Sequence, residues 1–308
     1  MKWRKLGVVW QPSGDLWWAR SYATCPTPLL LENGRFRIYV QCRDEDNVGR
    51  VGYVDIDPIN PLNVLRVSNT PVLEIGEPGT FDDNGVFQTS VIRSQDGRLF
   101  MYYVGFELCH RIRYRLLTGL AVSNDGGESF GKVKTTPILE RSVAEMHFRC
   151  GPFVLPATGG GYRMWYVAGS EWEQIEGKPM PVYDIRYAES TDGVHWPEQG
   201  LVVLSIDRET EHGFGRPYVV QQNNHYQLFY SIRKKSPCAY RMGYAVSPDG
   251  IHWKRQDAEM GLDISTHGWD SDAIEYAAIV NVGKRILCFY NGNDFGATGF
   301  GVAELEEE

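Results

Sequence analysis

The sequence predicts an all-β fold, a five-bladed β-propeller with four-stranded antiparallel blades, on the strength of three observations. A short aromatic strand recurs five times, another short strand follows each copy, and stretches with helical periodicity are hard to find. The copies align on tyrosines spaced by 64, 63, 64 and 60 residues, namely Tyr39, Tyr103, Tyr166, Tyr230 and Tyr290. Internal repeats of this length that contain only strands are typical of propeller blades.

Each repeat carries the signals of a hairpin and further strands. In the second repeat, residues 90–98 (SVIRSQDGR) give an apolar run and a polar turn, LFMYYVG from Leu99 is the aromatic strand, and TGLAVSND from Thr118 is the third strand. Outer strands are predicted for the first four repeats within residues 64–75, 132–140, 200–206 and 259–265. The fifth repeat lacks one, so we expect residues 3–11 (WRKLGVVWQ) to pair with it and close the ring, because propellers remove sheet edges in this way.

Three repeats continue into a turn with the pattern Ser-x-Asp-Gly and an aromatic residue just beyond. These turns are residues 123–130, 190–196 and 247–253. An aspartate in such a turn accepts hydrogen bonds from backbone N–H groups, and glycine tolerates positive φ. We therefore interpret the three turns as structural.

The length predicts one domain. Five repeats of about sixty residues account for nearly all of the 308 residues, so residues 1–308 are expected to form a single propeller. Hydrophobic residues make up 43% of the chain and aromatic residues 13%, which is enough for a large core.

The charge pattern argues against nucleic acid and membranes as partners. The net charge is −8, the sequence pI is about 5.5, and no lysine–arginine cluster follows any predicted strand. Residues 1–15 are basic, but their apolar run is too short for a signal peptide, and no segment reaches membrane-spanning length. We expect a cytoplasmic protein that does not insert into membranes.

Cysteine and histidine spacing gives no sign of a metal site. The six cysteines lack C-x-x-C spacing, and the seven histidines show neither H-x-x-x-H nor a Cys/His cluster. Reduced thiols and no cofactor are expected, while a calcium ion in the central channel is left open.

The predicted site lies where the inner strands meet. The first strand of each propeller blade lines the central axis, so residues before and within these strands converge at one mouth of the channel. The five segments concentrate charged and polar residues beside aromatic ones, at Arg20, Asp82, Asp83, Asn84, Glu145, His147, Arg149, His212, Arg216, Trp269, Asp270, Asp272, Glu275 and Tyr276. Asn293 follows in a glycine-rich segment, residues 291–301, that is expected to form a loop over the site. Acids for proton transfer, arginine forks and aromatic rings are what a sugar site requires.

Among the acids, Asp83 and Glu275 are the strongest catalytic candidates, followed by Glu145. Asp83 follows Asp82 in FDDNGV, where the chain turns into an inner strand, and Asp82 is equally well explained by an Asx-turn. Glu145 precedes its strand and could face solvent, as could His147.

Glu275 lies within a predicted apolar strand, where an acidic side chain is unusual and requires an explanation. Strand alternation places it opposite in facing to Ile274 and Tyr276. Burial would raise its pKa unless Arg149 or Arg216 lies close, and either arrangement suits a general acid or base. A buried Glu–Arg pair that ties blades together is the structural alternative.

These residues resemble the five-bladed propeller glycosidases of families 43, 32 and 130, over the whole chain. The segments FDDNGV, RCGPFVL, GRPYVV, GWDSDAIEY and YNGNDFGATGFG are similar, more narrowly, to uncharacterised propeller proteins encoded near surface-polysaccharide biosynthesis enzymes. This resemblance implies a cytoplasmic enzyme that acts on an activated or lipid-linked sugar.

The sequence departs from the pattern of families 43 and 32. The resemblance to these families would imply an acid on each of the first, second and third inner strands. Arg20 stands in the first segment without an acid, and the third reads Arg149-Cys150-Gly151-Pro152. Only the second acid is kept, as Asp83 or Asp82, so a partner must come from Glu275, Asp272 or Glu145.

We therefore expect a glycoside hydrolase that acts by inverting acid/base chemistry. One acid among arginines resembles instead the family 130 phosphorylases, with phosphate held by Arg149 and Arg216. A non-catalytic sugar-binding propeller and an interaction scaffold are the remaining alternatives.

Overall fold

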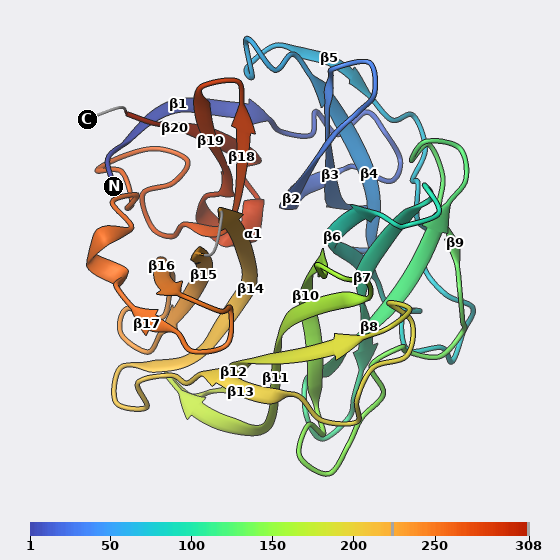
Figure 1. Ribbon diagram of the computed structural model, residues 1–308, viewed down its shortest axis with the longest axis vertical. Helices are drawn as coiled ribbons and strands as arrows, with labels where there is room; N and C mark the ends of the chain where they lie inside the picture. Colours follow the sequence, from blue (N-terminus) through green and yellow to red (C-terminus); the bar gives the residue numbers. More distant parts are fainter. Residues whose placement is uncertain (223–224, 307–308) are drawn as a thin grey trace.

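The computed structural model describes residues 1–222 and 225–306 (Figure 1). Apart from a three-residue 3-10 helix, η1 (Asp257–Glu259), and a four-residue helix, α1 (Asn293–Gly296), the regular structure of these residues is β-strand. The prediction of an all-β fold is confirmed for this part of the chain. None of its helices is long and apolar enough to cross a membrane.

The strands pair antiparallel in sets that follow the sequence repeats. The first four sets are β2 (Ser21–Leu30), β3 (Phe36–Arg43), β4 (Gly49–Ile56) and β5 (Val64–Val67); β6 (Val86–Arg93), β7 (Leu99–Leu108), β8 (Tyr114–Ser123) and β9 (Gly131–Lys132); β10 (Phe148–Pro156), β11 (Tyr162–Ile175), β12 (Lys178–Ser190) and β13 (Leu201–Leu204); β14 (Glu211–Gln222), β15 (His225–Lys234), β16 (Tyr240–Ser247) and β17 (Lys254–Arg255). Short parallel contacts join β8 to β10 and β12 to β14, so the second, third and fourth sets form one continuous sheet.

The last set combines the two ends of the chain. It is ordered β1-β20-β19-β18, with β18 (Glu275–Val282), β19 (Arg285–Asn291), β20 (Phe300–Leu305) and β1 (Trp3–Trp10). Trp3 lies opposite Leu305 and Trp10 opposite Phe300, which confirms the predicted pairing of residues 3–11 with the last repeat. Figure 1 shows the sets arranged around a common centre, with β1 beside β20.

The outer strands are shorter than predicted. In the fourth repeat the prediction of residues 259–265 is wrong, because the strand that pairs with β16 is β17, Lys254–Arg255. The chain then turns away because the Asp257 carboxylate accepts the Tyr244 N–H at 3.0 Å, in place of a further backbone bond. In the second repeat Gly131 and Lys132 pair with β8 as β9, and Leu139 adds an isolated antiparallel bridge to Thr118.

The Ser-x-Asp-Gly turns have the predicted structural role. Asp192, for example, accepts backbone N–H groups of Val194 and His195 at 2.9 and 2.8 Å, and Gly193 has φ +75°. The Trp196 indole donates back to the Gly193 carbonyl at 3.1 Å. The corresponding bonds occur at Asp125 and Asp249.

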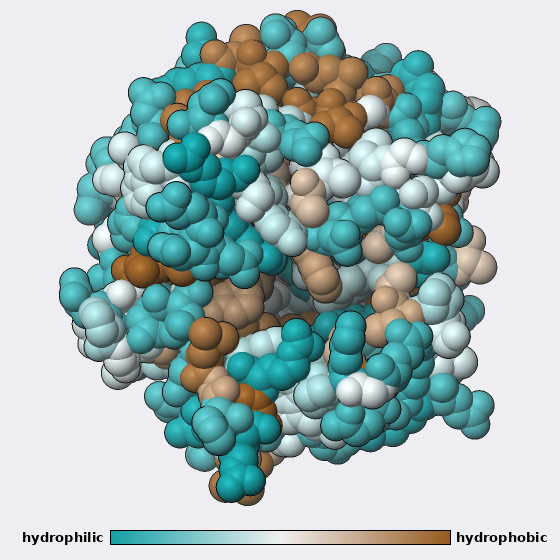
Figure 2. Space-filling view, turned by 180° about the vertical axis from the view of Figure 1, so that it is seen from behind, coloured by the Kyte–Doolittle hydropathy of each residue, from teal (hydrophilic) through white to brown (hydrophobic). Residues whose placement is uncertain are grey.

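The aligned tyrosines of all five repeats are fully buried in the core. The opposite face to that of Figure 1 is mostly hydrophilic, with an apolar band at its top edge and a hollow near its middle (Figure 2). Ile59, Leu62 and Leu65, which are 81%, 41% and 44% exposed, belong to the segment around β5, which lies at the top of Figure 1.

Candidate functional site

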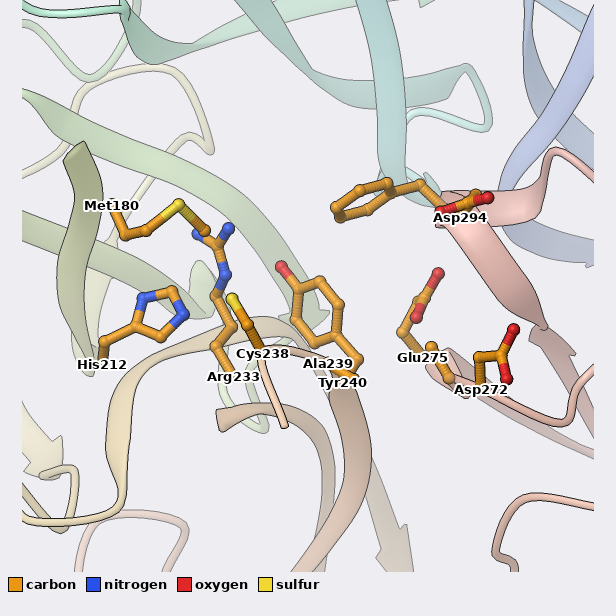
Figure 3. A pocket seen from close by; sticks show the side chains of 11 residues that line it. Met180, His212, Arg233, Cys238, Ala239, Tyr240, Asp272, Glu275 and Asp294 are labelled. Carbon is orange, nitrogen blue, oxygen red and sulfur yellow. The ribbon is translucent and has the colours of Figure 1, made fainter. Parts of the chain in front are cut away.

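A cavity of about 160 Å³ lies between the third, fourth and fifth repeats and brings opposite charges to facing walls (Figure 3). His212 of β14 and Arg233 of β15 lie on one wall, with Met180 of β12. Asp272, Glu275 of β18 and Asp294 of α1 lie on the other. Tyr240 of β16 stands between the two walls, and Phe295 completes the lining.

Glu275 is buried on the cavity wall without an ion-pair partner among the described residues. Its side chain is 1% exposed, its Oε1 atom makes no hydrogen bond, and no ion pair reaches it from the described residues. Burial raises the pKa of this carboxyl well above its usual value, although the Phe295 backbone amide partly opposes the shift. This shift favours the protonated form of the carboxyl, which is the form that a general acid needs.

The partners expected for Glu275 are elsewhere. Neither Arg149 nor Arg216 forms an ion pair with it, and the cations that bear on its charge are Arg233 and Arg241. Arg216 instead donates to the carbonyl oxygens of Tyr276 and Ala277, at 2.7 and 2.9 Å.

A β-bulge at the start of β18 sets the direction of Glu275. The register with β19 shifts between Glu275 and Ala278, and Tyr276 adopts φ +59°. The predicted simple alternation is therefore interrupted here. The Tyr276 ring packs beside Tyr240, with centroids 5.7 Å apart, and its N–H donates to the Ser231 hydroxyl at 2.8 Å.

The segment around α1 contributes to the cavity lining, in line with the expected loop over the site. Asp294 and Phe295 have φ of +53° and +59°, a strained conformation for residues other than glycine. The Thr24 hydroxyl donates to the Phe295 carbonyl at 2.6 Å and holds the segment. Phe295 is 42% exposed and meets the Tyr240 ring edge-on at 5.7 Å. The pair offers an aromatic surface to a ligand.

Asn293, predicted to bind substrate, shapes the site instead. Its side-chain oxygen accepts the backbone N–H groups of Asp272 and Ala273 at 2.7 and 3.1 Å. These bonds fix the loop that carries Asp272, whose exposed carboxyl lines the cavity.

The cationic wall was largely missed from the sequence. Arg233 is 6% exposed and donates to the Tyr183 hydroxyl, and its guanidinium lies 5.3 Å from the ring centres of Tyr183 and Tyr240. It follows the aligned Tyr230 by three residues, where the other repeats carry Cys42, Phe106, Gly169 and Asn293. Only the fourth repeat carries a cation at this position, and this difference between the repeats could have identified Arg233 from the sequence.

His212, the other member of this wall, is neutral. Its Nδ1 atom lies 3.0 Å from the Pro181 carbonyl oxygen. Burial, together with the charge of Arg233, lowers the pKa of His212 to about 4. Only Arg233 therefore brings a charge to this wall at neutral pH.

Three predicted acids are occupied by contacts within the protein. In each case an aligned tyrosine donates to the acid and a cation pairs with it, in the sets Tyr103–Asp82–Lys132, Tyr166–Glu145–Arg149 and Tyr290–Asp270–Lys5. All three acids are at most 1% exposed, which rules out the alternative, left open from the sequence, that Glu145 faces solvent. This geometry favours structural roles over the catalytic and binding roles predicted for them.

The arginines predicted to hold phosphate are also satisfied by the protein. Arg149 pairs with Glu145 and donates to the Glu140 and Pro197 carbonyls at 2.7 and 2.9 Å. Arg216 bonds the Pro26 carbonyl and the Thr27 hydroxyl of β2, in addition to its two carbonyl acceptors on β18. Neither lines the cavity.

The remaining predicted residues lie outside the cavity lining. Asp83 accepts the Gly79 N–H at 2.8 Å and contacts the Asn84 amide. Arg20 is exposed and donates to the Gly14 carbonyl. Trp269 packs on Tyr290 with centroids 5.0 Å apart. His147 is half-buried, and burial with the charges of Arg115 and Arg141 lowers its pKa.

The described residues hold no group of three or more His, Cys, Asp or Glu side chains placed to bind a metal ion. Within this cavity, the chemistry on offer is a buried carboxyl, two exposed carboxyls, a buried cation and two aromatic rings.

Comparison with known proteins finds relatives that match over their full length in sequence. The uncharacterized protein Rv1502 of Mycobacterium tuberculosis is 36% identical over 306 residues, covering 99% of this chain and 100% of that protein. An uncharacterized protein from a second strain of the same organism, MT1551, matches equally. No protein-family model matches the chain.

Solved structures with similar folds are glycoside hydrolases and their relatives. One described as a glycoside hydrolase has a TM-score of 0.75 at 18% identity, over 99% of this chain and 92% of its own. A member of the GH130 family, which contains mannoside phosphorylases and hydrolases of β-1,2-mannosidic linkages in Candida mannan, gives 0.70 at 14%, over 99% and 93%. A thermostable family-43 glycoside hydrolase gives 0.64 at 16%, over 94% and 91%. At these identities the likeness concerns the fold alone, and at that level the predicted resemblance to families 43 and 130 is confirmed.

Proposed function

The chain belongs to one family with the uncharacterized protein Rv1502 of Mycobacterium tuberculosis, and we propose that it is a carbohydrate-active enzyme of the glycosidase kind. Its substrate is a saccharide that enters the cavity between Arg233 and Glu275. The observation that carries the proposal is the Glu275 carboxyl, which is buried, unpaired and on the cavity wall. The likeness in fold to glycoside hydrolases supports it.

Glu275 acts as the general acid. Cleavage of a glycosidic bond needs a proton on the leaving-group oxygen and, in an inverting enzyme, a second carboxylate that takes a proton from the attacking water. Burial keeps the proton on Glu275 by raising its pKa. Asp272 offers an exposed carboxyl on the same wall and takes the second role, with Asp83 as the alternative base predicted from the sequence.

The four-stranded sets support a five-bladed propeller, with one blade for each repeat and β1 closing the ring, as a single domain over residues 1–308. An activated or lipid-linked sugar, from surface-polysaccharide biosynthesis, remains the proposed class of donor.

A non-catalytic sugar-binding protein is the second candidate. It is favoured by the burial of Asp82, Glu145 and Asp270 in ion pairs, which removes them from any reaction. Binding of a saccharide with no product after long incubation would support this candidate.

The test of the general acid compares leaving groups. A panel of dinitrophenyl and methyl glycosides of common hexoses is offered to the purified protein and to Glu275→Gln. Dinitrophenolate leaves without a proton, whereas methoxide does not, so the variant should lose about 100-fold or more on methyl glycosides and far less on dinitrophenyl glycosides. Equal losses on both would assign Glu275 another role.

The matched control is Glu32→Gln, since the Glu32 side chain is 88% exposed and lies on the surface. It should leave both rates unchanged. Unaltered activity in Glu275→Gln on every substrate would overturn the proposal.

A further inference from the structure

Arg233 is a buried cation on the cavity wall that forms no ion pair with any described acid. This observation indicates which class of sugar the cavity binds. We propose that Arg233 binds an anionic substituent, a carboxylate or a phosphate group, carried by the sugar that enters the cavity. The inference rests on the proposed function for the same site and adds to it the charge of the substrate.

Arg233 differs from the other buried arginines in what surrounds it. Arg37 pairs with Asp55 at 2.8 Å, Arg186 pairs with Glu145 at 3.0 Å, and Arg149 also pairs with Glu145. Arg216 has no acid partner but donates to four oxygen atoms. Arg233 forms no ion pair with any described residue and donates to a single phenol, Tyr183. A buried charge is normally paired, so this guanidinium has donors left for a ligand.

The surroundings hold Arg233 in place. Its guanidinium lies 5.3 Å from the ring centres of both Tyr183 and Tyr240. Gly213 of β14 makes this packing possible, because a Cβ atom there would lie 2.7 Å from the Tyr183 ring and 3.4 Å from Arg233 Cδ. A cation fixed in this way binds a planar or tetrahedral oxyanion without first losing much side-chain freedom.

The other charges of the cavity leave the field of Arg233 in place. Burial raises the pKa of Glu275, which favours its uncharged form, and burial lowers the pKa of His212 to about 4, which leaves the imidazole neutral. Asp272 and Asp294 lie beside Glu275 and away from Arg233 (Figure 3). A sugar with its acidic group toward Arg233 therefore presents its opposite side to Glu275, where a proton is available.

The test measures binding and needs no turnover. Isothermal titration calorimetry of the full chain compares glucuronate, galacturonate and glucose 6-phosphate with glucose, galactose and inorganic phosphate. We expect at least one acidic sugar to bind about tenfold or more tightly than its neutral parent. Arg233→Met should abolish this preference, while Arg66→Met, which removes a 53% exposed arginine, should preserve it.

Three outcomes overturn the inference: equal binding of acidic and neutral sugars, no binding of any acidic sugar at about 10 mM, or tighter binding of inorganic phosphate than of every acidic sugar. If Arg233→Met fails to fold, the comparison of ligands on the unaltered protein still decides.

The two proposals fail separately. Acidic sugars that bind through Arg233 in a protein that cleaves no glycoside would remove the proposed catalysis and keep this inference. If the protein cleaves neutral glycosides with the expected leaving-group dependence on Glu275 but shows no preference for acidic sugars, the proposed catalysis is kept and the inference about Arg233 is removed.

Discussion

The Tyr290 hydroxyl donates a hydrogen bond of 3.0 Å to the buried carboxylate of Asp270, which Lys5 of β1 also contacts at 2.6 Å. The contact joins the aromatic strand β19 to the segment that leads into β18, and links both to the N-terminal strand. Tyr103 and Tyr166 make the same kind of contact with Asp82 and Glu145. The repeated tyrosine is thus a connector within each of these repeats.

Replacement of Tyr290 by phenylalanine should destabilise the fold by about 1–3 kcal/mol, because a buried charged acceptor loses its donor while the ring stays in place. Urea unfolding followed by tryptophan fluorescence measures the change. Tyr39→Phe is the matched control, since the Tyr39 hydroxyl bonds an uncharged carbonyl, that of Gly127, at 3.1 Å. A loss at Tyr290 no larger than at Tyr39 would argue against the role of the acid.

The repeat made most of the fold predictable. The five aligned tyrosines and the Ser-x-Asp-Gly turns depend on local spacing, which a sequence displays directly. Pairing of residues 3–11 with the last repeat followed from the missing outer strand. The outer strand of the fourth repeat could not be predicted, because the Asp257 side chain, rather than backbone pattern, ends the ladder.

The site was harder to predict because sequence gives charge but not pairing. Asp82, Glu145, Asp270 and Glu275 all precede or begin an apolar strand, yet three of them are paired and only Glu275 is left alone. Which acid finds a cation depends on contacts between residues far apart in the chain, such as Lys5 with Asp270. Arg233 went unnoticed for the same reason.

Arg216 ties together strands of three repeats. From β14 it donates to Pro26 and Thr27 of β2 and to Tyr276 and Ala277 of β18. Arg216→Met should therefore destabilise the fold by about 3 kcal/mol, because buried carbonyl groups lose their donor. Urea unfolding measures the loss, and Arg216→Lys should recover part of it. Wild-type stability in Arg216→Met would contradict this role.

Asp125 should contribute stability that disappears in acid. Burial alone would raise its pKa, but hydrogen bonds from Ser123, Ser129 and the backbone N–H groups of Glu128 and Ser129 lower the pKa to about 2. A carboxyl whose pKa is lowered by folding stabilises the native state at pH values above its unfolded pKa of 3.8. That contribution is lost as the pH falls toward the folded pKa of about 2. Asp125→Asn should therefore be less stable than the unaltered protein near neutral pH, with the difference shrinking below pH 3.8. Thermal unfolding over this range tests it, with Glu32→Gln as an exposed control.

Glu275 should have the opposite dependence on pH. Its folded pKa lies well above the usual 4.5, so the native state keeps a proton that the unfolded chain gives up. Stability is full below pH 4.5 and declines as the pH rises toward the folded pKa. The glutamine side chain of Glu275→Gln cannot lose a proton. The variant should therefore have the stability of the unaltered protein near pH 4 and be the more stable of the two toward pH 8. Midpoints of urea unfolding measure the difference.

Glu145→Gln is the matched control for Glu275→Gln, because both residues are buried and only Glu145 is paired with arginines. Its removal leaves the buried Arg149 without an acid and leaves Arg186 with Asp184 as its one acid, so it should destabilise the fold by about 3–5 kcal/mol. A constant difference in stability between Glu275→Gln and the unaltered protein at every pH would indicate that the pKa of the carboxyl is the same in the native and unfolded states. If the stability of Glu275→Gln relative to the unaltered protein increases with pH, the Glu275 carboxyl destabilises the fold. This result is expected of a residue that is retained for catalysis.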